Sequence, residues 1–145
     1  MKKCNEVMTK DPVCCLPSDL VSKAADLMKR ERVGSIPVVE SEKTKKLVGI
    51  ITDRDLTMRI VAEGLDAQST KVETVMTRKV VTCSAEDNLQ NALTAMAENQ
   101  LRRIPIVGDN YEIIGIISQA DIALQGDHPK RTAAMVKEIS QSSGT

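Results

Sequence analysis

The sequence predicts a mixed α/β (α+β) fold, built from two tandem repeats of the order strand, helix, strand, strand, helix. The chain matches itself when Val7 is aligned with Val75 in the first part of the repeat and Gly49 with Gly115 in its second part. The matching segments are Val7-Met8-Thr9 with Val75-Met76-Thr77, Ile36-Pro37 with Ile104-Pro105, and Gly49-Ile50-Ile51-Thr52 with Gly115-Ile116-Ile117-Ser118. A unit of about 60 residues buries little surface alone. We therefore expect the two copies to pack as one pseudo-twofold module.

The repeats have predictable bounds and a common order of elements. We expect repeat 1 at residues 5–64, repeat 2 at 72–125, and a C-terminal helix and tail at 126–145. Each repeat begins with a short extended piece and a helix. Ser18 or Asp19 can cap the first of these helices, and Ser84 with Asp87 gives a pattern like a capping box for the second.

Two strands and a closing helix complete each repeat. The predicted strands are residues 35–39, 47–52, 103–107 and 113–118, and the predicted closing helices are residues 54–62 and 120–124. The second strand of each repeat is a continuous apolar run, which is typical of strands buried on both faces. Gly64 is the expected stop of the first closing helix.

Composition argues against several classes of function. The chain has 20 Lys plus Arg and 20 Asp plus Glu, so no net basic field attracts nucleic acid or an anionic membrane. The single aromatic residue, Tyr111, offers no stacking platform for bases. With His128 as the single histidine and no P-loop, we expect no metal site, no required cofactor and no catalytic residues.

The cysteines favour a reducing compartment. They are Cys4, Cys14, Cys15 and Cys83, they form no CxxC motif, and the adjacent pair is a poor disulfide framework. No apolar run approaches the length of a transmembrane helix and no signal peptide is present, so a cytoplasmic location is the expectation. The cysteines are expected to be small apolar core residues, with a redox or metal role as the alternative.

Each repeat contains the same ordered set of motifs, which are Val-Met-Thr, a helix, Ile-Pro-x-Val and then Gly-Ile-Ile-Thr/Ser-x-x-Asp. This set, found twice, resembles a pair of CBS domains, also called a Bateman module. The resemblance covers about residues 5–125 and is greatest to small stand-alone bacterial proteins of one CBS pair. It implies a non-catalytic regulatory module, of use in energy sensing, that binds AMP, ADP, ATP or S-adenosylmethionine in two clefts. It also implies a homodimer that signals through its packing to an effector protein, which the sequence does not name.

The resemblance assigns the sharpest site positions to Thr52-x-x-Asp55 and Ser118-x-x-Asp121. The carboxylates would accept hydrogen bonds from the ribose hydroxyls, since an ionised carboxylate can accept several. The Thr and Ser hydroxyls would lie at a helix start, where a phosphate is favoured. The alternative is a helix cap, which explains both residues without a ligand and can coexist with binding.

Arginines would bind the phosphate of the ligand. Arg102 and Arg103 stand just before Ile104-Pro105, and an arginine fork suits phosphate oxygens. Gly34-Ser35 replace them in repeat 1, where Arg54 is another candidate and its counterpart is Ala120. We therefore expect two unequal sites. The alternative for the arginines is a solvated pair of charges.

Adenine would lie between aliphatic side chains. The candidates are Val13, Cys15, Ile36 and Pro37 for one cleft, and Val81, Cys83, Ile104 and Pro105 for the other. Plain core packing is the alternative for each of them. The alternative for the whole chain is a structural dimerisation protein with degenerate, empty clefts, which the missing basic pair of repeat 1 favours.

Overall fold

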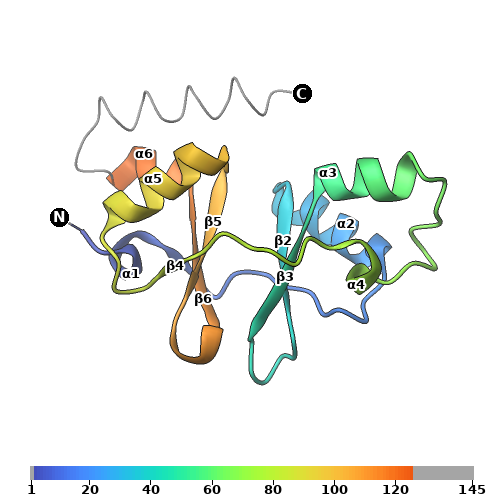
Figure 1. Cartoon of the computed structure of the whole chain (residues 1–145), viewed down its shortest axis with the longest axis horizontal. Helices are drawn as coiled ribbons and strands as arrows, with labels where there is room; N and C mark the ends of the chain where they lie inside the picture. Colours follow the sequence, from blue (N-terminus) through green and yellow to red (C-terminus); the bar gives the residue numbers. More distant parts are fainter. Residues whose placement is uncertain (1, 126–145) are drawn as a thin grey trace. The chain divides into compact units, whose positions relative to one another are not determined.

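A computed structural model describes residues 2–125 of the chain and confirms the α+β class. The predicted C-terminal helix and His128 lie outside the described residues. In chain order the elements are α1 (Cys4–Val7), β1 (Thr9–Lys10), α2 (Val21–Glu31), β2 (Ser35–Val39), β3 (Leu47–Thr52), α3 (Asp53–Asp55), the π-helix η1 (Leu56–Val61), α4 (Val72–Val75), β4 (Cys83–Ser84), α5 (Leu89–Asn99), β5 (Arg103–Val107), the 3-10 helix η2 (Asp109–Tyr111), β6 (Ile113–Ser118) and α6 (Gln119–Gln125) (Figure 1).

The four long strands have the predicted bounds. Full burial of both faces was wrong for β3, in which buried and half-buried residues alternate. Such alternation is typical of an antiparallel hairpin that meets the core with one face. Gly64 has φ +69, as a helix stop in the left-handed region requires.

The predicted caps of the two long helices were wrong. The N-cap residues of α2 and α5 are Leu20 and Asn88, and neither makes a side-chain cap. The carboxylates of Asp19 and Asp87 accept hydrogen bonds from backbone N–H groups three residues earlier, at 2.8 and 2.9 Å. These aspartates therefore close the turn that precedes each helix, and Ser84 belongs to β4.

Each hairpin is flanked by a parallel pairing on one side and an antiparallel pairing on the other. The four-stranded sheet has the order β1-β6-β5-β4, with β4 parallel to β5 and the other pairs antiparallel. The hairpin β2-β3 has single bridges in the equivalent places, a parallel one at Cys15–Val38 and an antiparallel one at Ile50–Thr77. The structure therefore repeats the internal symmetry of the sequence in its hydrogen bonding.

The described residues form two compact units, and neither unit is one continuous repeat. Unit 1 contains residues 2–12, 81–109 and 113–125, and unit 2 contains residues 13–80 and 110–112. Residues 2–12, which open repeat 1, therefore pack with the body of repeat 2, and residues 72–80, which open repeat 2, pack with the body of repeat 1. We call these two stretches the exchanged segments. The sequence did not predict this exchange.

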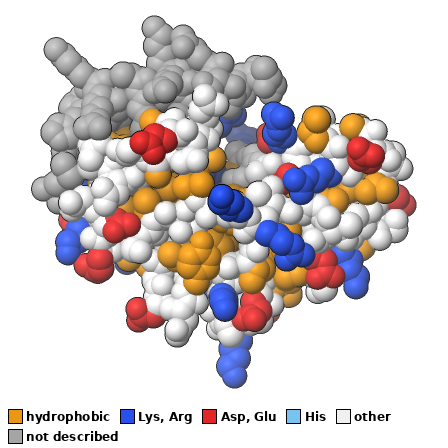
Figure 2. Space-filling model, viewed as in Figure 1, with side chains coloured by type: hydrophobic (Ala, Val, Ile, Leu, Met, Phe, Trp, Pro, Cys, Tyr) orange, Lys and Arg blue, Asp and Glu red, His pale blue; other side chains and the backbone are white. Residues whose placement is uncertain are grey.

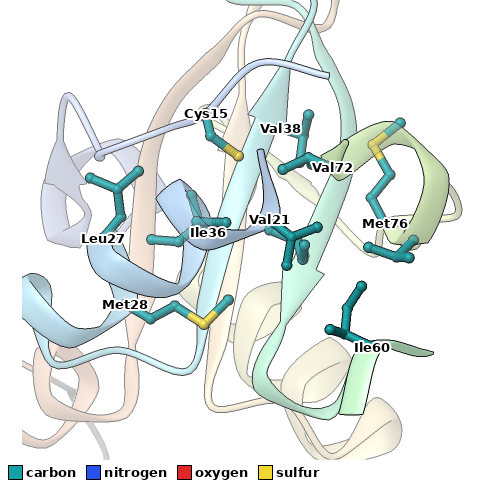
Figure 3. Packing of buried hydrophobic residues seen from close by; sticks show 12 residues of the cluster. Cys15, Val21, Leu27, Met28, Ile36, Val38, Ile60, Val72 and Met76 are labelled. Carbon is teal, nitrogen blue, oxygen red and sulfur yellow. The ribbon is translucent and has the colours of Figure 1, made fainter. Parts of the chain in front are cut away.

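Each unit has its own core, to which an exchanged segment contributes. Figure 3 shows the cluster of unit 2, where Val72 and Met76 pack with side chains of α2, β2 and η1. In unit 1, Cys4 and Val7 of α1 join a cluster formed mainly by α5 and β5. Burial of these apolar side chains holds each exchanged segment in place.

Candidate functional site

In both units, the end of the second hairpin strand meets a threonine of the exchanged segment. The Thr/Ser-x-x-Asp motif spans the end of that strand and the first turn of the helix that follows. We call each group a carboxylate corner, formed by Thr52, Asp55 and Thr77 in unit 2 and by Ser118, Asp121 and Thr9 in unit 1.

Reciprocal hydrogen bonds hold both carboxylates. Thr52 N donates to Asp55 Oδ2 at 3.0 Å, and Asp55 N donates to Thr52 Oγ1 at 3.0 Å. Ser118 N donates to Asp121 Oδ2 at 3.0 Å, and Asp121 N donates to Ser118 Oγ at 3.2 Å. These pairs are capping boxes, so the capping role considered for both motifs is confirmed.

The exchanged threonines add a further donor to each carboxylate. Thr77 Oγ1 lies 3.2 and 3.3 Å from the two carboxylate oxygens of Asp55, and Thr9 Oγ1 lies 3.4 Å from both oxygens of Asp121. A carboxylate offers about four acceptor positions, so each retains capacity for a further donor. Sequence analysis missed both threonines, although the repeated Val-Met-Thr was the signal that marked them.

The two corners differ in charge and exposure. Asp55 is buried, and the Nε atom of Arg59 lies 3.8 Å from its Oδ1. Arg59 Nη1 also donates to the backbone oxygens of Val75 and Met76, at 2.9 and 3.3 Å. Asp121 is half-buried, and the repeat alignment that pairs Asp55 with Asp121 places an uncharged glutamine at the position equivalent to Arg59. Sequence analysis missed Arg59, which ties the exchanged segment to the corner of unit 2.

The predicted arginines of repeat 2 stand next to the corner of unit 1. Arg103 is the direct partner of Ser118 in the β5–β6 register, and Gln119 N donates to Arg102 O at 3.0 Å. The side chain of Arg102 is exposed and that of Arg103 is half-buried. The strand pairing therefore brings both arginines to the strand end that carries Ser118.

At the equivalent edge of unit 2, Asp53 lies close to Gly34. Asp53 N donates to Gly34 O at 2.8 Å, and a Cβ atom added to Gly34 would lie 2.9 Å from Asp53 Oδ2. Arg54 is exposed, and its N–H donates to Asp53 Oδ1 at 2.8 Å. The two predicted sites are therefore built from different charged residues.

Most side chains predicted to contact adenine are deeply buried. Cys15 and Ile36 belong to the core cluster of unit 2, and Cys83 and Ile104 belong to that of unit 1. Pro37 and Pro105 are also buried, Val81 is half-buried, and Val13 is 38% exposed. Core packing is thus shown for the two isoleucines and two cysteines, and contact with adenine stays a prediction.

The raised pKa of the Cys15 thiol predicts that the folded protein loses stability at alkaline pH. Burial, with smaller contributions from Asp19 and Cys14, raises its pKa from 9.0 to about 12. A raised folded pKa means that the stability from the neutral thiol is complete below pH 9 and is lost as the pH rises towards 12. We expect the free energy of unfolding to fall by up to about 1.4 kcal/mol per pH unit there.

Urea unfolding at pH 8 and pH 10.5 measures this effect. The variant Cys15→Ala should show a shallower loss of stability between the two pH values than the wild type. An equal loss in both proteins would contradict the assignment to Cys15.

Charges of both signs are interspersed on the face of the molecule that Figure 2 shows. Within residues 2–125, no group of three or more His, Cys, Asp or Glu side chains is arranged to hold a metal ion. The described helices include none that is long and apolar enough to cross a membrane.

Comparison with known proteins identifies relatives of similar size and a longer one. The family model of the CBS domain matches residues 4–62 and 72–125. The CBS domain-containing protein YhcV of Bacillus subtilis is 38% identical over 124 residues, covering 86% of this chain and 85% of that protein. Inosine-5'-monophosphate dehydrogenase of Methanocaldococcus jannaschii is also 38% identical over 131 residues, but this chain spans 25% of its length.

Solved structures show the same fold. Hypoxic Response Protein I, solved with two coordinated zinc ions, has a TM-score of 0.77 at 26% identity, covering 86% of this chain and 98% of that chain. A protein of that name from Mycobacterium tuberculosis is 27% identical over 123 residues. The CBS domain pair of protein MJ0100, solved with 5′-methylthioadenosine and S-adenosyl-L-methionine, has a TM-score of 0.72 at 24% identity, covering 86% of this chain and 94% of that chain. With its two matched segments, its stand-alone relatives and its fold, the chain belongs to the CBS domain family.

Proposed function

We propose that this CBS pair is a non-catalytic regulatory module that binds an adenosine nucleotide through its carboxylate corners. The observation that carries the proposal is the Asp121 carboxylate, which is half-buried at a strand end and oriented by Ser118 and Thr9. A ribose diol presents two O–H donors to such a carboxylate. The complex of the same fold with two adenosine compounds supports this class of ligand.

Charge favours the corner of unit 1 for a phosphorylated ligand. The charged residues named at this corner are Arg102, Arg103 and Asp121, and those named at the corner of unit 2 are Arg54, Arg59, Asp53 and Asp55. The first set sums to one positive charge and the second to zero. An arginine fork binds phosphate oxygens in a bidentate manner. We therefore expect AMP, ADP or ATP to bind at Asp121 more tightly than at Asp55.

A thermal-shift panel with AMP, ADP, ATP and S-adenosylmethionine tests the proposal. A ligand at about 100 times its dissociation constant stabilises a protein by about 2.7 kcal/mol, which raises the melting temperature by several degrees. Asp121→Asn should remove the shift, because it removes the charge and replaces one acceptor by a donor. Asp87→Asn is the matched control, since Asp87 makes the same backbone contact three residues back but lies in no carboxylate corner.

The outcomes separate binding from capping. If the Asp121 variant loses the nucleotide shift and the Asp87 variant keeps it, the corner is a binding site. If no nucleotide shifts the wild type, the aspartates are caps only and the nucleotide proposal fails. Loss of the shift in Asp55→Asn, with the shift kept in Asp121→Asn, would move the site to unit 2.

A second candidate function is self-association through exposed apolar side chains. In unit 2 the helical segment after Asp55 exposes Met58 at 52% and Val61 at 74%, and Leu65 just beyond it is 45% exposed. In unit 1, α6 exposes Leu124 at 83%. Exposed apolar side chains that gather on one segment are typical of interaction sites. This observation favours a homodimer, and it keeps the structural dimerisation protein as the alternative function.

We expect Val61→Asp to shift the protein from dimer to monomer. A charge at this position would have to be desolvated in an apolar interface, which is costly. Size-exclusion chromatography with light scattering measures the mass, and Glu63→Gln on the same exposed stretch is the control. A wild type that is monomeric at all concentrations would contradict this candidate.

A further inference from the structure

The corner of unit 2 contains a cation that the internal repeat does not copy in unit 1. Arg59 Nε lies 3.8 Å from Asp55 Oδ1. The repeat alignment that pairs Asp55 with Asp121 places Gln125, which carries no charge, at the position of Arg59. Arg59 also lies in the π-helix η1, whereas the matching stretch of unit 1 is the α-helix α6. Since π-helical turns are frequent at functional sites, this difference between the two corners points to a role for Arg59.

Backbone carbonyl groups of the exchanged segment hold the guanidinium group of Arg59 in place. Its Nη1 atom donates to Val75 O at 2.9 Å and to Met76 O at 3.3 Å. Both acceptor residues are buried and directly precede Thr77, which is the other side-chain neighbour of the Asp55 carboxylate. The side chain of Arg59 is 51% exposed, so these hydrogen bonds fix its position more than burial does. A planar guanidinium group is well suited to such a bridge between several oxygen atoms.

The position of Arg59 decides which acceptor positions of Asp55 a ligand can reach. A carboxylate has about four acceptor positions, and a ribose diol needs two of them. Thr52 N donates to Oδ2 of Asp55, and Thr77 Oγ1 lies close to both oxygens, so Oδ1 is the less used oxygen. Arg59 stands beside this Oδ1 atom. Asp55 is 7% exposed, whereas Asp121 is half-buried. Arg59 thus covers the oxygen that a diol would have to reach.

We infer that Arg59 is a specificity-determining residue, which occupies the Asp55 carboxylate as an internal cation and closes the corner of unit 2 to the ribose diol. The inference rests on the proposed function, because it concerns the same contact between a carboxylate and a ribose. A chain therefore binds one adenosine compound, at Asp121, although its sequence contains the motif twice. The closed corner holds the exchanged segment instead, since Arg59 joins Asp55 to the carbonyl groups of that segment.

Equilibrium dialysis of the full chain against adenosine counts the open corners. Adenosine is uncharged, so the loss of an arginine charge does not itself repel it. We expect the wild type to bind one adenosine per chain and Arg59→Gln, which copies the residue of unit 1, to bind two. Adding Asp121→Asn to Arg59→Gln should leave one site, and adding Asp55→Asn as well should leave none. The new site should reject 2′,3′-dideoxyadenosine, which lacks the diol.

The chain offers a matched control for the loss of an arginine. Arg30 Nε lies 3.0 Å from Oδ2 of Asp26, so Arg30→Gln also breaks an ion pair between an aspartate and an arginine four residues later. This variant should keep the single site of the wild type. Arg59→Met keeps the aliphatic stem and should gain the second site, so it replaces Arg59→Gln if that variant does not fold. Urea unfolding under the dialysis conditions establishes that each variant is folded.

The number of sites separates this inference from the proposed function. Two sites in the wild type would overturn the inference and leave the proposed function in place. A folded Arg59 variant with no more sites than the wild type would also overturn it. No site in the wild type but one in Arg59→Gln, lost again on addition of Asp55→Asn, would support the inference and contradict binding at Asp121.

Discussion

Replacing Gly115 with alanine is expected to lower the free energy of unfolding by about 2 kcal/mol. A Cβ atom on Gly115 would overlap the Met8 side chain, with Met8 Cγ at 2.7 Å and Met8 Cβ at 3.0 Å. The Cβ atom of Met8 is fixed to the backbone, so relief requires movement of the exchanged segment itself. That movement would also draw Thr9 away from Asp121. Urea unfolding followed by circular dichroism measures the loss.

Two further variants test this explanation. Gly108→Ala is the matched control, because its nearest neighbour would be Ile114 Cγ2 at an ordinary 3.5 Å. It should change stability by only a few tenths of a kcal/mol. Met8→Ala in the background of Gly115→Ala should recover part of the loss, since the overlapping atoms beyond Cβ are removed. A loss for Gly115→Ala as small as that of the control would contradict the close approach.

Asp55→Ala is expected to be the most destabilising change at the corners, by about 3 kcal/mol. The buried carboxylate accepts hydrogen bonds from Thr52 N and Thr77 Oγ1, and its removal leaves these donors unpaired and Arg59 without its anion. Asp121→Ala should cost about 1 kcal/mol, the ordinary value for a lost cap. Asp121 is half-buried and its threonine donor lies at a longer distance.

The comparison of the two alanine variants separates structure from binding. We expect stability to depend more on Asp55 and nucleotide binding to depend more on Asp121. Urea unfolding without ligand gives the first quantity, and the thermal shift with nucleotide gives the second. Equal losses of stability would show that Arg59 adds nothing to the corner of unit 2. Asp55→Asn is a useful control, because it keeps one acceptor oxygen and should lose less stability than Asp55→Ala.

The sequence predicted the hairpins because their signals are local. β-Branched residues bounded by polar loops are typical of strands, and all four long strands have the predicted bounds. The capping boxes were visible for a similar reason, since Thr52 and Asp55 are three residues apart. By contrast, the caps of α2 and α5 were wrong because Asp19 and Asp87 can bond backwards as well as forwards.

The internal repeat of the sequence could not predict the exchange of segments. Equivalence of Val-Met-Thr in two repeats tells which residues correspond, but it is the same whether each segment packs with its own repeat or with the other. The choice depends on contacts such as Met8 with Gly115 and Thr77 with Ile50, which join residues far apart in the chain. Arg59 was missed for the same reason, since its carbonyl acceptors belong to an exchanged segment.

The exchange also sets an order of events during synthesis on the ribosome. Unit 2 has its β3 bridge to Thr77 and most of its core once residue 80 has emerged, because it draws on residues 13–80 for all but a short loop. The exchanged segment of residues 2–12 has to wait longer, since Thr9 pairs with Ile116. Until β4 and α5 appear, the apolar face of α1 lacks its partners of the folded unit, and such surfaces are where nascent chains are prone to aggregate. Residues 2–12 are thus translated before the rest of unit 1 but complete their pairing only when β6 has been made.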